Sequence, residues 1–477
     1  MWLAKPLRFD YPCAWEWLGP GGLPGLQNLW RVALRVAVGS TPIHSRLILQ
    51  TMDHRLSSIV YGRRSTKVIM PVPEIELLTS VVSKVFTIED VTAGNGKDFI
   101  VRYRGYFLTE DTVAAYDQVA EVVRQYKVMP LFRKEADGKQ AIFFAPSLPD
   151  VPLRANPRTN VMLFLLAVFS AMLVGVNIPS EIACADFMTV VNYSLQHIWS
   201  GWPFALAMMG ILFAHEMGHY LACRYYGIPA TLPFFIPAPF ISPFGTLGAF
   251  IAMRGIPKNK RILFDVGVAG PLAGLVIAVP VLLYGLSISP LGGLNTSGCG
   301  GSLEGNSLFY LFSKYLIFGK LLPEPPTMSG MPSFLYWLKY FFSSRPIPFG
   351  GLDVQLSSVA WAGWGGLLVT ALNLMPVGTL DGGHVLYGLF GEKAQKTFSI
   401  VIGALVVFSV LPVILTLSLT AFNSAWLLWG TILFWLGRVR TTPLDDITPL
   451  DTKRRVLGYI VLIIFFLIFT PIPLIGY

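Results

Sequence analysis

The sequence predicts a mainly α-helical, polytopic membrane protein with a small N-terminal soluble α/β module and a re-entrant β-like segment. Apolar residues make up 53% of the 477 residues and charged residues only 13%, whereas soluble globular proteins carry about 25% charged residues. Several windows also reach the roughly 20 apolar residues that a helix needs to cross the hydrocarbon core of a bilayer. These observations argue against a soluble enzyme and indicate an integral membrane protein.

Three regions are expected in chain order. Residues 1–65 are tryptophan-rich, broken by proline and without a stable hydrophobic period, so they are expected to form an N-terminal extension, for which disorder is one interpretation. Residues 66–157 have the composition of a soluble domain and are expected to form the α/β module. Residues 158–477 carry the long apolar windows and are expected to form the membrane domain.

Hydrophobic periodicity predicts the elements of the soluble module. Segments 86–90 and 97–107 alternate as strands do and are separated by a Gly-Asn-Gly turn. After Asp111, apolar residues recur at three- and four-residue spacing, which predicts a helix with one apolar face. Segments 129–134 and 140–144 flank an Ala-Asp-Gly turn and predict a hairpin. Nothing in this module has the pattern of a catalytic group.

Seven membrane spans are expected, within a range of six to eight. Two further segments, 303–319 and 331–343, are shorter, aromatic and flanked by glycine and proline, which is more typical of interfacial or re-entrant pieces. The seven predicted spans are residues 159–178, 202–224, 263–288, 355–375, 397–419, 423–438 and 455–475.

Loop charges predict the orientation of these spans. Twenty of the 36 Lys and Arg residues precede Asn160, five lie in 224–261, five lie in 438–455, and none lies in 179–201. The positive-inside rule then places the N-terminus in the cytosol. It also accounts for the net charge of +9, so no nucleic-acid partner is expected; a basic surface for anionic lipid or nucleic acid is the alternative. No transit peptide is convincing, which favours a bacterial plasma membrane over a thylakoid or plastid membrane.

Two smaller groups of residues allow more than one interpretation. Cys184 and Cys299 fall on the same predicted side of the membrane, so a disulfide between them is a hypothesis, with two unpaired cysteines as the alternative. Asp445, Asp446 and Asp451 are interpreted as part of a solvated loop rather than as a second metal site.

The strongest chemical signal is His215-Glu216-Met217-Gly218-His219 inside the predicted span 202–224. Residues four apart lie on one face of a helix, so His215 and His219 can bind one metal ion. Glu216 lies beside that face, where a general base can take a proton from an attacking water. A buried polar helix face is the alternative, but ionisable groups inside a membrane span usually mark function.

Two histidines leave a catalytic zinc ion one protein ligand short. Asp381 is the candidate third ligand, because it follows the span 355–375 and precedes a Gly-Gly pair that permits a tight turn. His215 lies thirteen residues after Trp202, roughly 20 Å into a core of about 30 Å. This depth is on the side of the membrane where Asp381 is expected to emerge, so the two halves of the site can meet.

The HExxH sequence and the distant Asn373-x-x-Pro376-x-x-x-Leu380-Asp381-Gly-Gly sequence together resemble the site-2 protease family of intramembrane zinc metalloproteases, peptidase family M50. The soluble module and the Pro-Leu-Asp-Asp run at 443–446 resemble its cyanobacterial and chloroplast branch. The resemblance covers about residues 75–477. It implies that His215, His219 and Asp381 bind Zn2+ and that Glu216 activates water. It also implies that Asn373 positions the substrate or the developing oxyanion.

The same resemblance implies the function. Residues 158–477 would form a transmembrane zinc protease domain that hydrolyses peptide bonds of transmembrane substrate proteins, in regulated intramembrane proteolysis or membrane protein turnover. Residues 229–255 would be the re-entrant piece near the site. The implied partners are transmembrane proteins and the lipid bilayer, and no oligomeric state is predicted. Two alternatives remain: a membrane zinc peptidase that trims lipidated or soluble peptides, and a non-catalytic zinc-containing membrane chaperone or binding protein.

Overall fold

The computed structural model describes most of the chain after residue 73. The predicted extension 1–65 lies outside the described residues, as does Cys299, whereas Cys184 is disulfide-bonded. The described residues are 74–96, 98–135, 137–147, 156–294, 302–325, 332–344, 346, 350–417, 422–436 and 442–476.

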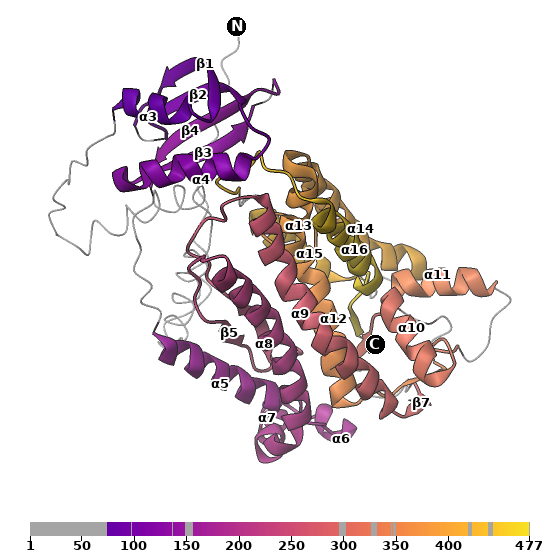
Figure 1. The fold of residues 1–477 in the computed structure, drawn as a ribbon. Helices are drawn as coiled ribbons and strands as arrows, with labels where there is room; N and C mark the ends of the chain where they lie inside the picture. Colours follow the sequence, from indigo (N-terminus) through magenta and orange to yellow (C-terminus); the bar gives the residue numbers. More distant parts are fainter. Residues whose placement is uncertain are drawn as a thin grey trace, which may run out of the picture.

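A four-stranded antiparallel sheet with two helices forms the N-terminal module, and its strands fall in the four windows that the sequence predicted (Figure 1). The strand order is β1-β2-β4-β3. The module has its own core, in which Leu78, Phe132 and Phe144 are fully buried. Its elements are α3 (Ile75–Val82), β1 (Phe86–Ala93), β2 (Val101–Phe107), α4 (Thr112–Val123), η1 (Arg124–Tyr126), β3 (Val128–Lys134) and β4 (Gln140–Pro146).

The rest of the described chain is mainly helical. Two-stranded pairs join β5 to β6, β7 to β9 and β8 to β10. Its longer helices are α5 (Pro157–Val174), α8 (Trp202–Tyr225), α9 (Lys260–Ser287), α12 (Ser358–Asn373), α14 (Thr397–Thr416), α15 (Ser424–Leu436) and α16 (Thr452–Ile468). Its shorter elements are α6 (Ser180–Ala183), α7 (Phe187–Gln196), η2 (Ile198–Gly201), β5 (Phe234–Pro237), β6 (Thr246–Phe250), β7 (Leu291–Gly293), β8 (Ser302–Glu304), α10 (Leu308–Phe318), α11 (Ser333–Ser343), β9 (Leu352–Val354), α13 (Asp381–Phe390), η3 (Gly391–Lys396) and β10 (Leu474–Gly476).

Within the described residues, four helices are long and apolar enough to cross a membrane: Pro157–Val174, Ile198–Tyr225, Lys260–Ser287 and Asp381–Thr416. They overlap the predicted windows 159–178, 202–224, 263–288 and 397–419. Helices α12, α15 and α16 overlap the other three windows, with 16, 13 and 17 residues, which is less than the roughly 20 of a typical span. The chain is therefore a mostly helical membrane protein with at least these four candidate spans.

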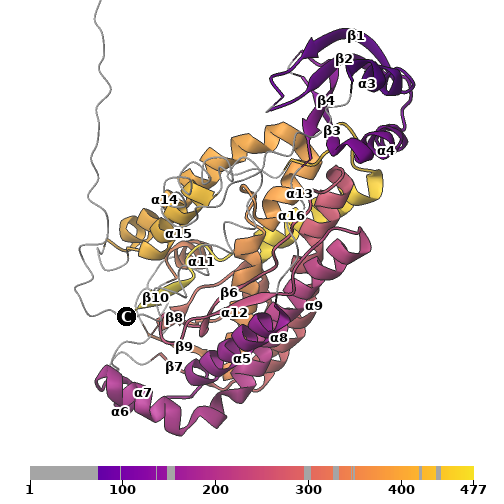
Figure 2. The ribbon, with the colours of Figure 1, turned by 90° about the vertical axis from the view of Figure 1, so that its left-hand side faces the viewer.

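Helices α8, α9 and α12 pack against one another at the centre of the bundle, and α13 packs against α9. Glycines allow the backbones to approach closely. A Cβ at Gly363 of α12 would lie 2.6 Å from the Cα of Leu282, and one at Gly285 would lie 2.3 Å from the backbone nitrogen of Ala360. Small residues at helix interfaces favour such packing in membranes. Figures 1 and 2 show the N-terminal module at one end of this bundle and α6 and α7 at the other.

Segment 444–446 joins the module to the bundle. The amide of Phe132 in β3 donates to the carbonyl of Leu444 at 2.9 Å, and the amide of Asp445 donates to the carbonyl of Lys258, just before α9, at 2.7 Å. Asp445 and Asp446 are both buried, and burial raises the pKa of Asp445. The interpretation of these two acids as a solvated loop is wrong, because their segment is enclosed between the sheet and the helices.

We expect Gly285→Ala to destabilise the protein, because the added methyl group meets the backbone at the start of α12. Overpacking of this kind costs about 1–3 kcal/mol. Thermal unfolding of the detergent-solubilised protein measures the change. Gly403→Ala is the matched control, since nothing lies within 4 Å of a Cβ at Gly403 in α14. Equal melting temperatures for the two variants would contradict the close approach of α9 and α12.

Candidate metal centre

The two histidines of the HExxH sequence lie on one face of α8 and point toward each other. His215, Glu216 and His219 are 3%, 5% and 8% exposed, so all three side chains are enclosed by protein. The two Nε2 atoms are 3.2 Å apart. Two imidazole nitrogens this close, inside an apolar helix bundle, can both bind the same metal ion.

The carboxylate of Asp381, at the start of α13, lies next to these two Nε2 atoms. Its Oδ2 atom lies 3.3 Å from Nε2 of His215 and 3.2 Å from Nε2 of His219. One ligand atom from each of the three residues lies within 4.8 Å of the other two. The structure therefore brings together all three residues that the sequence proposed as metal ligands.

The turn between α12 and α13 explains the glycines after Asp381. A Cβ at Gly382 would lie 1.9 Å from the carbonyl oxygen of Leu374, and one at Gly383 would lie 2.4 Å from that of Gly378. Gly378 itself has a φ of 55°, which favours glycine. The chain can thus reverse within seven residues and present Asp381 at the first position of a new helix.

Helix α9 forms a wall of the site that the sequence analysis did not identify. Nδ1 of His219 lies 2.8 Å from the carbonyl oxygen of Val266. Because a carbonyl can only accept, Nδ1 carries the proton, and the lone pair of Nε2 is left for a metal ion. A Cβ at Gly270 would lie 2.1 Å from Nε2 of His219, and one at Gly274 would lie 3.3 Å from His215.

The remaining polar groups surround these three residues. The amide nitrogen of Asn373, at the end of α12, lies 3.2 Å from Nε2 of His215. The carboxylate of Glu216 accepts a hydrogen bond from the backbone of Ile251, directly after β6. His384 packs against Gly267 of α9, behind Asp381. Asn373 and Glu216 therefore both lie next to the histidine–aspartate group.

The donor set fits a zinc ion. Catalytic zinc sites generally combine three nitrogen, oxygen or sulfur ligands from the protein with one open position. Two imidazoles and one carboxylate supply such a set, and the borderline-soft imidazoles select against calcium and magnesium, which prefer all-oxygen sites. Glu216, buried next to His215 on the same helix, could serve as a general base for a water at such a site.

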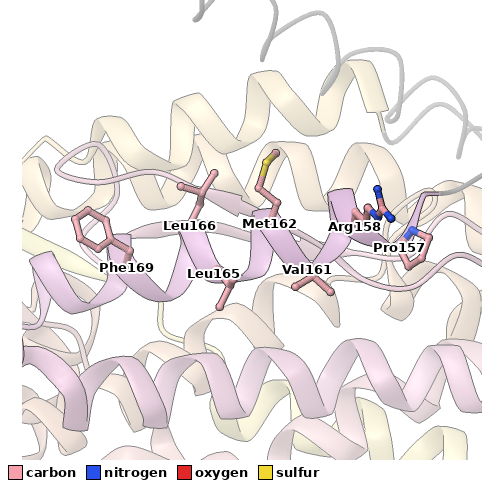
Figure 3. Close-up of a pocket in the computed structure, with 7 residues that line it drawn as sticks. All are labelled: Pro157, Arg158, Val161, Met162, Leu165, Leu166 and Phe169. Atoms are coloured by element: carbon pink, nitrogen blue, oxygen red, sulfur yellow. The ribbon is translucent and has the colours of Figure 1, made fainter.

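A pocket elsewhere on the molecule has a different character. It follows one face of α5 and is lined by Pro157, Arg158, Val161, Met162, Leu165, Leu166 and Phe169 (Figure 3). Arg158 is the one ionisable side chain among these lining residues, and the rest are apolar. This face has the composition of a surface that contacts lipid, and it offers no group for acid–base chemistry.

Comparison with known proteins gives a consistent family. Residues 203–417 match the model of peptidase family M50. The chain is 29% identical over 330 residues to the probable chloroplastic zinc metalloprotease EGY1 of Oryza sativa subsp. japonica, covering 66% of this chain and 50% of that protein. It is 28% identical over 357 residues to the probable chloroplastic zinc metalloprotease EGY2 of Arabidopsis thaliana, covering 73% and 55%. The chain thus spans about half the length of these curated relatives. No solved structure matches it.

We expect Gly270→Ala to weaken zinc binding by at least about tenfold, because the methyl group would occupy the space beside Nε2 of His219. Zinc content after dialysis against a chelator series measures the change. Gly274→Ala is the comparison variant on the same helix, since its Cβ would lie 3.3 Å from His215, a contact that a shift of a few tenths of an ångström relieves. Wild-type zinc retention in Gly270→Ala would show that this position need not lack a side chain.

Proposed function

Through residues 203–417 the chain belongs to peptidase family M50, and from this premise we propose that it is an intramembrane zinc metalloprotease of the site-2 type. In this proposal it hydrolyses peptide bonds of transmembrane substrate proteins, in regulated intramembrane proteolysis or in membrane protein turnover. The observation that carries the proposal is the convergence of His215, His219 and Asp381 from two separate helices, with Glu216 beside them.

The residues of the site have distinct roles. His215, His219 and Asp381 hold the zinc ion, which when bound acts as a Lewis acid toward water and the scissile carbonyl. Glu216 takes a proton from the attacking water as its oxygen bonds to the carbonyl carbon, and gives a proton to the leaving amine as the C–N bond breaks. Asn373 is placed beside His215, where its amide can donate to the substrate carbonyl as negative charge develops.

A substrate helix must unwind before cleavage, because its carbonyls are occupied by backbone hydrogen bonds. The hairpin β5–β6 supplies a candidate clamp. Strand β5 is held against α5, where Asn160 donates to the carbonyls of Leu232 and Pro233 at 2.8 and 2.9 Å. Strand β6 pairs only with β5 among the described strands, and the chain then continues directly to Ile251 beside Glu216. An unwound substrate segment that pairs with the outer edge of β6 would pass the catalytic base.

The proposal includes a membrane arrangement. Residues 66–157 form a soluble module, and residues 158–477 form the protease domain with seven spans, in which 229–255 is re-entrant and the N-terminus is cytosolic. The protein is placed in a membrane, either the bacterial plasma membrane or a thylakoid or plastid membrane. The names of the chloroplastic relatives favour a thylakoid or plastid membrane. Transmembrane proteins are the proposed substrates.

The alternative function is a zinc-containing membrane chaperone or binding protein without catalysis. The position of Glu216 favours the protease, because a purely structural zinc site has four protein ligands and no need of a general base. The two functions differ in a single measurable property, the hydrolysis of a bound transmembrane segment.

We expect Glu216→Gln to keep one zinc ion per chain and to lower cleavage of single-span reporter substrates by at least about a hundredfold, because the amide cannot accept the proton from water. Metal analysis of purified protein and gel analysis of the reporters measure both. His215→Ala is the companion variant, which should lose zinc and cleavage together.

Each result in this experiment has a definite meaning. Cleavage by the wild type alone, with zinc in both proteins, supports the protease and the role of Glu216. Cleavage that survives in Glu216→Gln would rule out this mechanism. Zinc binding with no cleavage of any reporter by the wild type would favour the binding protein.

We expect Gly248→Val to slow cleavage roughly tenfold while zinc content stays unchanged, because a branched side chain on β6 would obstruct a pairing substrate strand. Nothing lies within 4 Å of a Cβ at Gly248, whereas one at Gly245 would meet the backbone of α5 at 2.7 Å. Gly248→Val therefore adds no clash with α5, but valine is strained at the backbone φ of 101° that Gly248 adopts, so the control must carry the same kind of strain. Gly319→Val is the control, since Gly319 also has a positive φ and open space but lies in α10's C-terminal cap. Full activity of Gly248→Val would remove the clamp.

A further inference from the structure

One carboxylate joins the ends of three helices. Asp265, in α9, accepts from Nε of Arg454 at 2.8 Å and from Nη2 of Arg454 at 2.6 Å. It also accepts from the hydroxyl of Tyr226, the residue that caps the end of α8. Arg454 lies in the first turn of α16 and also donates to Asp451, the N-cap of that helix, at 2.5 Å. These groups are partly buried, with 28% of the Arg454 side chain and 20% of the Asp265 side chain exposed.

We propose that Arg454, acting through Asp265, is a positioning residue for the metal centre. In this inference, which rests on the proposed function, Asp265 and Arg454 together hold the hydroxyl of Tyr226, the C-cap of α8, and so fix the axial position of α9 against α8. The carbonyl of Val266 then orients the imidazole of His219. Arg454 donates to Asp265, Asp451 and Tyr226 and not to the three ligands or Glu216, so its role is indirect.

The position of Asp265 along α9 carries this argument. The next residue is Val266, whose carbonyl accepts from Nδ1 of His219 at 2.8 Å. One turn further along, Gly270 lies against Nε2 of the same histidine. A slide of α9 by one residue moves the helix about 1.5 Å along its axis, which is enough to break the Val266 hydrogen bond and to bring other atoms against the histidine.

A small apolar cluster links this ion pair to both sides of the site. Cys223, Ile228 and Val266 form its buried centre, and Tyr226 and Ile251 pack against it. Ile251 is the residue whose backbone binds the carboxylate of Glu216. A change at the Tyr226–Asp265–Arg454 contact therefore reaches His219 through Val266 and Glu216 through Ile251.

The guanidinium group suits this task better than other cations would. It forms two parallel hydrogen bonds with one carboxylate in a fixed planar geometry. A lysine ammonium retains the charge but binds as a single point. Without Arg454, Asp265 would keep one hydroxyl partner for a partly buried charge, and the end of α9 would lose its fixed orientation.

The test compares variants of the full-length protein in detergent. We expect Arg454→Gln and Asp265→Asn each to weaken zinc binding about tenfold in competition with a chelator, as loss of an outer contact to a metal ligand commonly does. The visible spectrum of the Co2+-loaded protein should change in both, because the His219 ligand is reoriented. The double variant should bind zinc no more weakly than either single variant, since both remove the same interaction. Arg454→Lys should restore part of the affinity.

Arg261→Gln is the matched control. Arg261 lies in the first turn of α9 and joins this helix to the C-terminal region through a 3.0 Å hydrogen bond to the carbonyl of Pro449, but it makes no hydrogen bond or ion pair with Asp265 among the described residues. We expect its zinc affinity and Co2+ spectrum to equal those of the wild type. Tyr226→Phe removes one hydroxyl and provides a milder variant if Arg454→Gln does not fold; we expect an intermediate loss of affinity.

The outcomes separate this inference from the proposed function. Wild-type zinc affinity and an unchanged Co2+ spectrum in folded Arg454→Gln, or in Tyr226→Phe if Arg454→Gln does not fold, would overturn the positioning role and leave the protease proposal intact. An equal loss in Arg261→Gln would also overturn it, by showing that any weakening at this end of α9 suffices. A wild-type protein that binds no zinc would remove both the proposed function and the inference.

Discussion

The meeting of two imidazoles and one carboxylate inside an apolar helix bundle is the interaction on which the rest of this structure depends. Ionisable groups in such surroundings are costly unless they bind each other, a metal ion or backbone groups. His215, His219 and Asp381 satisfy this requirement together. Residues that act together at a site must be held within about 0.5 Å of the productive geometry, so α8 and α13 depend on the helices packed against them.

Helix α9 packs against α8 and α13 and carries glycines where it faces the site, so no side chain of α9 fills that space. Its glycines at 267, 270 and 274 face His384, His219 and His215 respectively, and each leaves room for a side chain from another helix. The same helix offers one backbone carbonyl, that of Val266, to select the tautomer of His219. Small residues therefore serve two purposes here, since they permit close helix packing and leave space for a metal ion.

The two ends of α9 are held in different ways. At its start, segment 444–446 lies between β3 of the N-terminal module and residues 257–259, and the hydroxyl of Tyr387 in α13 donates to Asp446 at 2.8 Å. At its far end, Gly285 packs against the backbone of α12. The module is thus connected through buried polar contacts to both α9 and α13. This connection gives the module a direct structural path to the helix that begins with Asp381.

The sequence by itself determined the membrane class, the strands of the module and the three residues that meet at the site, because hydrophobic periodicity and the four-residue spacing of His215 and His219 are local properties. The metal chemistry then required a third ligand, and Asp381 was the suitable acid. Only the tertiary structure decided that Val266 orients His219, that Asp445 is buried, and that Arg454 binds Asp265 across 189 residues. Such contacts depend on how helices that are distant in sequence pack against each other, and the local sequence pattern does not determine this packing.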